Sequence, residues 1–225
     1  MAWKRPEILD LWCRHMNRIR FELKNVVEIV PHICGSEREA EMIAANRVIA
    51  YNHSKNEPLG EKANNRLRYV KNLLPDYVLF LGSDDFITKE LILFYVDMIR
   101  KGFEEIAPMD IYYIAGKQAA YSPGYVNSRK GESLAVGRLL STRVLKLVKW
   151  TLWGPLTKVG LDSNARNRLD QVGHKKFTYK LREENLFIVD VKGKDSLTKF
   201  VMRDHFEPYD IKELLIKIPI LNGII

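Results

Sequence analysis

Two adjacent carboxylates follow one of the apolar runs of the sequence. Residues 77–81 read YVLFL, and the next four residues, GSDD, end in Asp84 and Asp85. Five apolar residues between Pro75 and Gly82 predict a strand buried on both faces, and open α/β sheets bind ligands beyond the carboxyl ends of their strands. Two carboxylates at such a place repel each other unless they share a cation. Because Mg²⁺ and Mn²⁺ bind carboxylates together with substrate phosphates, the pair predicts a metal-bridged diphosphate.

The same two aspartates also have a purely structural explanation. A helical pattern begins near Thr88, shortly after Asp84 and Asp85. Carboxylates that precede a helix accept hydrogen bonds from its free N–H groups and favour the positive end of its dipole. The short SDD sequence by itself leaves both explanations open.

Hydrophobic periodicity predicts strands that alternate with helices over the first half of the chain. The expected helices cover residues 6–19, 37–46, 58–74 and 88–102, and the expected strands lie within residues 25–34, 47–56, 77–81 and 109–116. After residue 116 the pattern is less regular, with a polar loop at 117–133, helices at 136–150 and 160–173, and strands at 175–181 and 186–193. This order predicts an α/β fold with a mixed, mainly parallel sheet flanked by helices. We expect one domain over residues 1–225, more irregular after residue 116.

Composition narrows the classes of protein that the chain can represent. The 225 residues are 46% hydrophobic and 28% charged, which is typical of a soluble globular domain with its own core. Two cysteines make a disulfide framework or a zinc site unexpected and favour a reducing, cytoplasmic location. The N-terminus shows no signal-peptide pattern, and no apolar stretch reaches the roughly 20 residues that span a membrane. A net charge of +8 favours polyanionic partners.

Several segments together resemble the nucleotide-sugar-dependent glycosyltransferases of the GT-A fold, most closely the inverting family 2 with its small soluble phage and bacterial members. The segments are WKRPEIL (3–9), NEPLGEKANNRL (56–67), YVLFLGSDDFIT (77–88), GRLLSTRVL (137–145) and LWGPLTKVGLDSNARNRLDQVG (152–173). The resemblance implies a Rossmann-related fold. It also implies that residues 1–116 bind the nucleotide sugar and that residues 117–225 form the acceptor side and a C-terminal tail.

The resemblance also implies roles for residues on the donor side. Asp85 would be the direct ligand of Mn²⁺ or Mg²⁺, and Asp84 would contact the ribose or reach the metal through water. Arg5, Lys62 and Asn64 would contact the nucleotide or its diphosphate. For these three residues a solvated polar position on or beside a helix is an equally simple explanation.

Further roles follow for the acceptor side. An inverting transfer needs a general base that takes the proton of the acceptor hydroxyl, and Asp162 is the candidate, although it could instead cap the helix that follows. Trp153 could stack on a sugar, and Arg138 could face the diphosphate or a polyanionic acceptor. His205 would be a further metal ligand, although a lone histidine is more often structural.

The sequence thus predicts a metal-dependent glycosyltransferase that moves a sugar, with inversion, from a nucleoside-diphosphate donor to a hydroxyl group. The acceptor stays open between a modified DNA base, a surface glycan and protein, and the basic charge favours a polyanion such as DNA. One alternative is a nucleotidyltransferase, which uses paired carboxylates but usually has a Gly-rich basic loop that is not found in this sequence. Another alternative is a non-catalytic module that binds nucleotides or nucleic acid.

Overall fold

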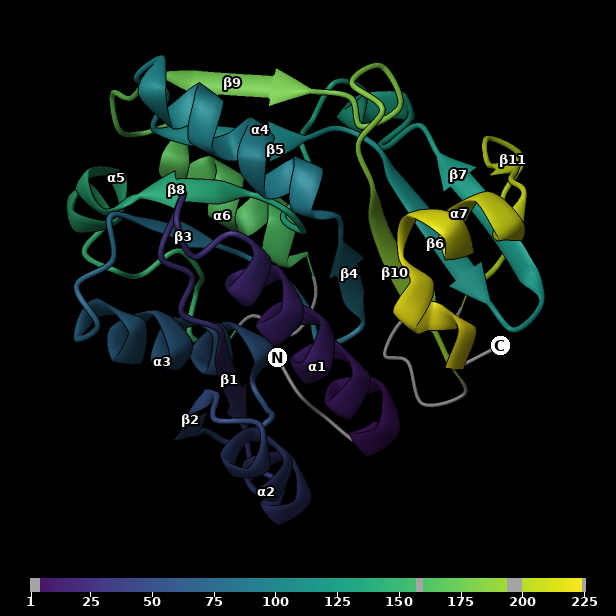
Figure 1. Cartoon of the computed structure of the whole chain (residues 1–225). Helices are drawn as coiled ribbons and strands as arrows, with labels where there is room; N and C mark the ends of the chain where they lie inside the picture. The colour runs from purple at the N-terminus through teal and green to yellow at the C-terminus, as the bar shows by residue number, and fades with distance from the viewer. Residues whose placement is uncertain (1–4, 157–159, 194–199, 224–225) are drawn as a thin grey trace.

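The computed structural model describes residues 5–156, 160–193 and 200–223. Helices and strands alternate along the chain, and Figure 1 shows helices on both sides of the strands. The helices are α1 (Pro6–Glu22), α2 (Arg38–Asn46), α3 (Leu59–Lys71), α4 (Lys89–Arg100), α5 (Thr142–Leu147), α6 (Leu161–Leu169) and α7 (Ile211–Lys217), with short 3₁₀ turns η1 (Asn127–Arg129) and η2 (Pro219–Gly223). The strands are β1 (His32–Gly35), β2 (Ala50–His53), β3 (Tyr77–Leu79), β4 (Asp85–Ile87), β5 (Glu105–Pro108), β6 (Ile111–Ala115), β7 (Gln118–Ser122), β8 (Leu139–Ser141), β9 (Lys176–Tyr179), β10 (Ile188–Lys192) and β11 (Glu207–Pro208).

The strands form three sheets, which confirms the α/β class. Their orders are β1-β2, β3-β8-β5-β9 and β11-β7-β6-β10-β4. Parallel pairing joins β1 to β2, β6 to β10 and β5 to β9, whereas the other described pairs are antiparallel. The sheets are therefore mixed, with more antiparallel pairing than the sequence led us to expect. Strands from both halves of the chain pair with each other, because β3 joins β8 and β4 joins β10.

The first apolar run differs from its prediction in a way that decides the environment of the aspartates. β3 ends at Leu79, the chain bends, and Asp85 begins β4, which belongs to another sheet. Thr88 is the N-cap residue of α4, and no side chain caps that helix. The helix-cap explanation of the aspartates is therefore wrong, because a strand separates them from the helix.

Two segments of the second half contain strands that periodicity missed. The expected loop at 117–133 contains β7, which forms a hairpin with β6 through Gly116 and Lys117. Gly116 has a φ of 56°, which a two-residue hairpin turn requires at its first central position. The expected helix at 136–150 begins as β8 and becomes helical only at Thr142, because Leu139 and Leu140 pair with β3 and β5.

The core covers both halves of the chain. The larger buried cluster joins α1, α4, β4, β6 and β10, and a second cluster around Leu140 and Leu152 lies under α3 and α6. The apolar C-terminal segment enters the larger cluster through three buried residues: Leu214, Ile218 and Leu221. Among the described helices, none combines the length and apolarity needed to cross a membrane.

Candidate active site and metal centre

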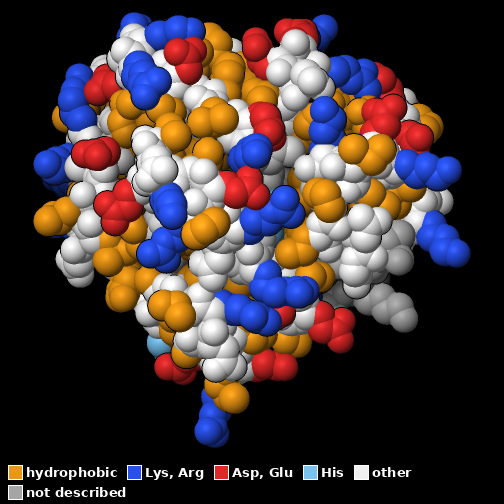
Figure 2. Space-filling model, viewed as in Figure 1, with side chains coloured by type: hydrophobic (Ala, Val, Ile, Leu, Met, Phe, Trp, Pro, Cys, Tyr) orange, Lys and Arg blue, Asp and Glu red, His pale blue; other side chains and the backbone are white. Residues whose placement is uncertain are grey.

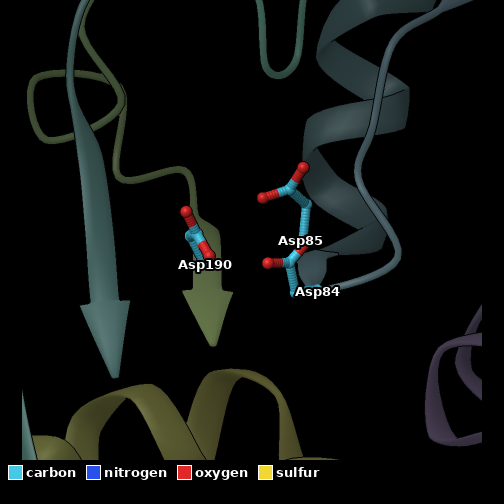
Figure 3. Close-up of side chains that lie close together, drawn as sticks. All are labelled: Asp84, Asp85 and Asp190. Carbon is cyan, nitrogen blue, oxygen red and sulfur yellow. The ribbon is translucent and has the colours of Figure 1, made fainter. Parts of the chain in front are cut away.

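Three carboxylates from two neighbouring strands meet at one point. Asp84 and Asp85 stand at the start of β4, and Asp190 lies on β10, where it pairs directly with Asp85. One carboxylate oxygen from each residue lies within 4.8 Å of the others. Figure 3 shows the three side chains turned toward one another across the two strands. Among the residues that the structure describes, these three form the group that could hold a metal ion.

Helix α1 and a glycine fix the geometry of the first two carboxylates. The Trp12 indole N–H donates to the backbone oxygen of Asp85 (3.0 Å), and His15 Nε2 donates to Ile87 O (2.6 Å), so α1 holds β4 at both ends. The backbone N–H of Gly82 donates to the Asp85 carboxylate. A Cβ at Gly82 would lie 2.6 Å from an oxygen of Asp84 and 2.8 Å from one of Asp85, so only glycine leaves room for both carboxylates.

The electrostatics of the three aspartates are those of a cluster with too much negative charge. Burial and then the charge of Asp84 raise the pKa of Asp85 to about 7. Burial and then the other two carboxylates also raise the pKa of Asp190 well above its ordinary value. Burial would raise the pKa of Asp84 as well, but its hydrogen bond and ion pair with Arg5 outweigh burial and lower it. Two of three buried carboxylates therefore resist ionisation in the absence of a cation.

The donor set fits a hard divalent cation. The Asp190 Oδ1 atom is buried and has no hydrogen-bond partner, while Oδ2 accepts from Lys192 Nζ at 2.6 Å. A buried carboxylate oxygen without a partner is costly, and a metal ion would satisfy it. Asp85 and Asp190, with Asp84 beside them, could hold Mg²⁺ or Mn²⁺, since both ions prefer oxygen ligands.

Arg5, for which the sequence predicted a contact with the nucleotide or its diphosphate, lies at the acidic cluster. Its Nη1 donates to Asp84 Oδ2 at 2.6 Å, and both side chains are largely buried, 11% and 14% exposed. The pair holds the start of α1 against the loop before β4. Arg5 therefore neutralises one of the three carboxylates and leaves the other two for a cation.

Lys62 belongs to a polar group at the carboxyl ends of β1 and β2. Its Nζ donates to the side chain of Asn56, whose amide donates to Ser36 Oγ at 2.7 Å and to Glu37 Oε1 at 2.9 Å. Ser36 and Glu37 directly follow β1, and Asn56 follows β2. The first turn of α3 therefore brings an ammonium group to the edge of the sheet where α/β proteins bind ligands.

Arg66 is a residue that the sequence did not single out. It lies one helical turn after Lys62 on α3, and its Nη1 donates to Leu81 O at 3.2 Å. Burial lowers its pKa, and the nearby carboxylate of Asp85 opposes that shift. The i, i+4 spacing from Lys62 was the available signal, because residues four apart share one face of a helix. Lys62 and Arg66 thus form a cationic face on α3, with Arg66 bonded to the loop that leads to the aspartates.

Asp190 was also missed, although it completes the metal group. Its position in FIVDVK, one acid inside an apolar strand, was the signal in the sequence. An isolated carboxylate on a buried strand needs a partner. Asp190 stands 105 positions after Asp85 in the chain, and only the pairing of β10 with β4 shows that the two residues lie side by side.

Asp162 and Asp190 each lie next to a tyrosine. Its carboxylate accepts a hydrogen bond from the Tyr125 hydroxyl, and the Arg129 guanidinium lies 3.5 Å from the centre of the Tyr125 ring. Burial and then Asp162 raise the pKa of Tyr125, whereas burial and then Asp190 and Asp85 raise the pKa of Tyr113, with a smaller effect from Tyr125. Tyr113 pairs directly with Asp190, so both side chains lie on one face of the sheet.

The structure corrects the expectations for Asn64 and Trp153. The Asn64 side chain accepts from the backbone N–H groups of Leu152 and Trp153, at 3.1 and 3.2 Å, and donates to Trp153 O at 2.8 Å. The Trp153 indole is 4% exposed and donates to Leu161 O. Both side chains hold α3 and α6 together in the second core cluster. Neither one is open to a nucleotide or to a sugar in this structure.

Arg138 and His205 also lie elsewhere than expected. Arg138 is 2% exposed and forms an ion pair with Glu105, in a buried network away from any opening to a substrate. His205 packs edge-on against Phe206, with ring centres 4.8 Å apart, and it is not in the metal group of the described residues. Phe206 stacks on Tyr113, so His205 lies beside the site without reaching its carboxylates.

No family model and no curated protein matches this sequence. Solved structures resemble it weakly. Crystalline A197 from STIV has 9% identity and a TM-score of 0.46, with 79% of this chain and 100% of that chain covered. CMP:2-keto-3-deoxy-manno-octonic acid synthetase complexed with CTP has 11% identity and a TM-score of 0.45, with 94% of this chain and 87% of that chain covered. UDP-glucose pyrophosphorylase complexed with UDP-glucose has 10% identity and a TM-score of 0.42, with 96% of this chain and 86% of that chain covered.

Proposed function

We propose that this protein is a metal-dependent glycosyltransferase that moves a sugar from a nucleoside-diphosphate donor to a hydroxyl acceptor. The observation that carries the proposal is the group Asp84, Asp85 and Asp190, in which the pKa values of Asp85 and Asp190 stay raised although Lys192 pairs with Asp190. A cation bound there would supply the positive charge that a diphosphate leaving group needs. The cationic face of α3 supports the same donor class.

The donor side has separate groups for the two ends of a nucleotide sugar. Lys62 and its partners Asn56 and Ser36 stand at the carboxyl ends of β1 and β2, where they could bind the nucleotide. Arg66 donates to Leu81 O, just before Gly82 and the aspartates, so it could bind the diphosphate. Arg5 would keep Asp84 ionised and in place.

Asp162 is the proposed general base. In the reaction the acceptor oxygen forms a bond to the anomeric carbon, the bond from that carbon to the diphosphate oxygen breaks, and the nucleoside diphosphate leaves. The acceptor proton passes to the Asp162 carboxylate, which the Tyr125 hydroxyl orients. A single displacement of this kind inverts the anomeric configuration.

The same acidic group also fits a second candidate, nucleotidyl transfer. A sugar phosphate that attacks a nucleoside triphosphate is already an anion, so this reaction needs the cation and the cationic residues but no general base. The products would be a nucleotide sugar and pyrophosphate. The two reactions share the acidic cluster and differ in their dependence on Asp162.

The acceptor of the glycosyl reaction is proposed to be anionic because the chain has a net charge of +8. On the face that Figure 2 shows, Lys and Arg side chains are interspersed with Asp and Glu. The excess charge on that face is spread out, which favours general attraction to a polyanion such as DNA or an acidic glycan.

Thermal-shift titration with UDP-, GDP- and TDP-sugars, each with and without Mn²⁺, tests the donor class. We expect a rise in melting temperature that requires both the metal and a nucleotide sugar, since ligands that bind the native state stabilise it. The Asp190→Asn variant should lose the metal-dependent part, while the surface control Asp97→Asn should retain it. Pyrophosphate release from a triphosphate and a sugar phosphate, unaffected in Asp162→Asn, would instead establish nucleotidyl transfer. Absence of any metal-dependent shift would contradict both reactions.

A further inference from the structure

A deep apolar cleft separates β1 from β3. Its volume is about 740 Å³, and it is lined by residues 26–32, by β3 and by one side each of α1, α3 and α4. Most of the lining is Val, Leu and Ile. His32 also lines the cleft, and both of its ring nitrogens are buried without a hydrogen-bond partner. The cleft thus leaves apolar side chains without packing partners and a buried imidazole without a hydrogen bond, whereas the interior of a folded domain normally supplies both.

Each side of the cleft has a strand edge without a strand partner. β1 pairs only with β2, and β3 pairs only with β8, within the part of the chain that the structure describes. Phe80 N–H donates to Arg138 O at 2.9 Å, and Asp76 O accepts from Thr142 at 2.8 Å, so even-numbered residues bond to β8. Because antiparallel bonding alternates along a strand, the N–H and C=O groups of Tyr77 and Leu79 point to the cleft.

The rim of the cleft is apolar and exposed. Val26 and Val30 are 48% and 52% exposed on one side, and Leu73 and Leu74 are 41% and 87% exposed on the other. The intervening Val27 and Ile29 turn inward and touch the core. Residues 26–30 therefore alternate as a β-strand does and consist largely of β-favouring residues, yet they pair with no strand.

The chain order makes the two edges natural neighbours. β1 and β2 are parallel and are joined through α2, and α3 then leads from β2 back to β3. If β3 joins the free edge of β1, the sheet becomes β2-β1-β3-β8-β5-β9, with the crossover through α3. In such a sheet the chain turns to opposite sides of β1, which is the position where α/β sheets bind ligands.

We propose that residues 28–33 and 77–81 pair as parallel strands in a closed state of the sheet. The structure with the cleft is then the open state of the same sheet. Closure satisfies the free backbone groups of both edges and buries the apolar rim. In a permanently open form, the unpaired edges and the exposed apolar rim would favour aggregation. It also brings Ser36 at the end of β1 toward Gly82 and the aspartates at the end of β3. The proposal does not depend on which reaction the site performs.

Amide hydrogen exchange of the wild-type protein, resolved by residue, tests the closed state. Val78 and Phe80 serve as internal controls, because their amides bond to β8 in either state. We expect the amides of Tyr77 and Leu79 to exchange at least about 100-fold more slowly than unstructured amides, at every protein concentration. Exchange of these two amides at unstructured rates, with the controls protected, would overturn the proposal. Protection that appears only at high concentration would also overturn it, because a second copy would then fill the cleft.

A chemical cross-link gives an independent measurement. Val26→Cys and Leu74→Cys place thiols on the two rims at exposed positions, where substitutions are tolerated best. Native Cys13 and Cys34 are fully buried and should not compete. A short bismaleimide should join the rim pair at least about 10-fold faster than the control pair Val48→Cys and Leu74→Cys, since Val48 does not line the cleft. Equal rates for the two pairs would contradict closure.

Discussion

Asp85 and Glu105 are both buried carboxylates on strands, but the charges around them are opposite. Asp85 lies beside two other carboxylates, and its pKa is raised to about 7 by burial and by Asp84. Glu105 is 1% exposed and faces three cations, with His174 at 2.6 Å, Arg138 at 3.4 Å and Lys176 at 3.6 Å. Burial would raise the pKa of Glu105, but His174, Arg138 and Lys176 outweigh burial and lower it.

The difference distinguishes a charge-balanced network from the candidate metal site. Glu105 is surrounded by cations of the protein itself, and it serves to hold β5, β8 and β9 together. The acidic cluster has two paired cations, Arg5 and Lys192, for three carboxylates, and the pKa values of Asp85 and Asp190 remain raised, so its charge is not fully balanced. The comparison predicts opposite results when each cluster is altered.

The largest effect is expected for Asp85→Asn. Loss of a metal ligand should reduce metal-dependent activity by on the order of 1,000-fold, which corresponds to about 4 kcal/mol of transition-state stabilisation. The metal-free variant should unfold at the same denaturant concentration as the wild type or at a higher one, because a source of repulsion is gone. Activity assays with Mn²⁺ and urea unfolding check the two parts. A strongly destabilised variant with normal metal response would assign Asp85 to structure.

Glu105→Gln should show the reverse pattern. Removing the carboxylate leaves the buried Arg138 guanidinium without its ion pair, which should cost about 3 kcal/mol of unfolding free energy. Metal affinity of the folded fraction should be unchanged. The neighbouring Glu104→Gln is the matched control, because its partner Arg143 is 58% exposed and a surface pair contributes less than about 1 kcal/mol. Similar urea midpoints for the two variants would contradict a structural role for the Glu105 network.

Gly82→Ala tests the geometry of the acidic cluster without changing its charge. The added methyl group would lie within 2.8 Å of oxygens of both Asp84 and Asp85, so these carboxylates must move. We expect metal affinity to fall by about 10-fold, or roughly 1.4 kcal/mol, measured by calorimetric titration with Mn²⁺. Gly173→Ala is the control, since a Cβ at that position meets no atom within 4 Å. An unchanged affinity in Gly82→Ala would mean that the carboxylates adjust freely.

The smallest effect is a pH dependence that belongs to the Glu105 network. His174 Nε2 faces the Glu105 carboxylate and Nδ1 faces Val172 O, so a protonated ring can donate from both nitrogens. The hydrogen bond to Glu105 raises the pKa of His174 above its ordinary 6.5. A raised pKa adds stability that is fully present below pH 6.5 and is lost as pH rises through the folded-state pKa. Urea unfolding across this range should show the loss in the wild type and not in His174→Gln.

Local patterns in the sequence were sufficient for part of the site. Asp84 and Asp85 after an apolar run, Arg5 before a helix and Lys62 near the start of α3 could all be selected from residue type and spacing, because each lies at the end of an element that short-range periodicity predicts. The same patterns could not separate Arg138, Asn64 and Trp153 from binding residues. Whether a polar side chain is buried depends on contacts with distant segments, such as Arg138 with Glu105.

The sequence by itself determined the α/β alternation, the paired carboxylates and the net positive charge of this protein. Only the tertiary structure decided that Asp85 begins a strand of a second sheet and that Asp190 stands opposite it. It also placed Arg66 beside the loop that leads to this cluster and surrounded Glu105 with three cations. The physical reason is that periodicity reports which face of one element is buried, whereas charge balance at a point depends on which strands pair there.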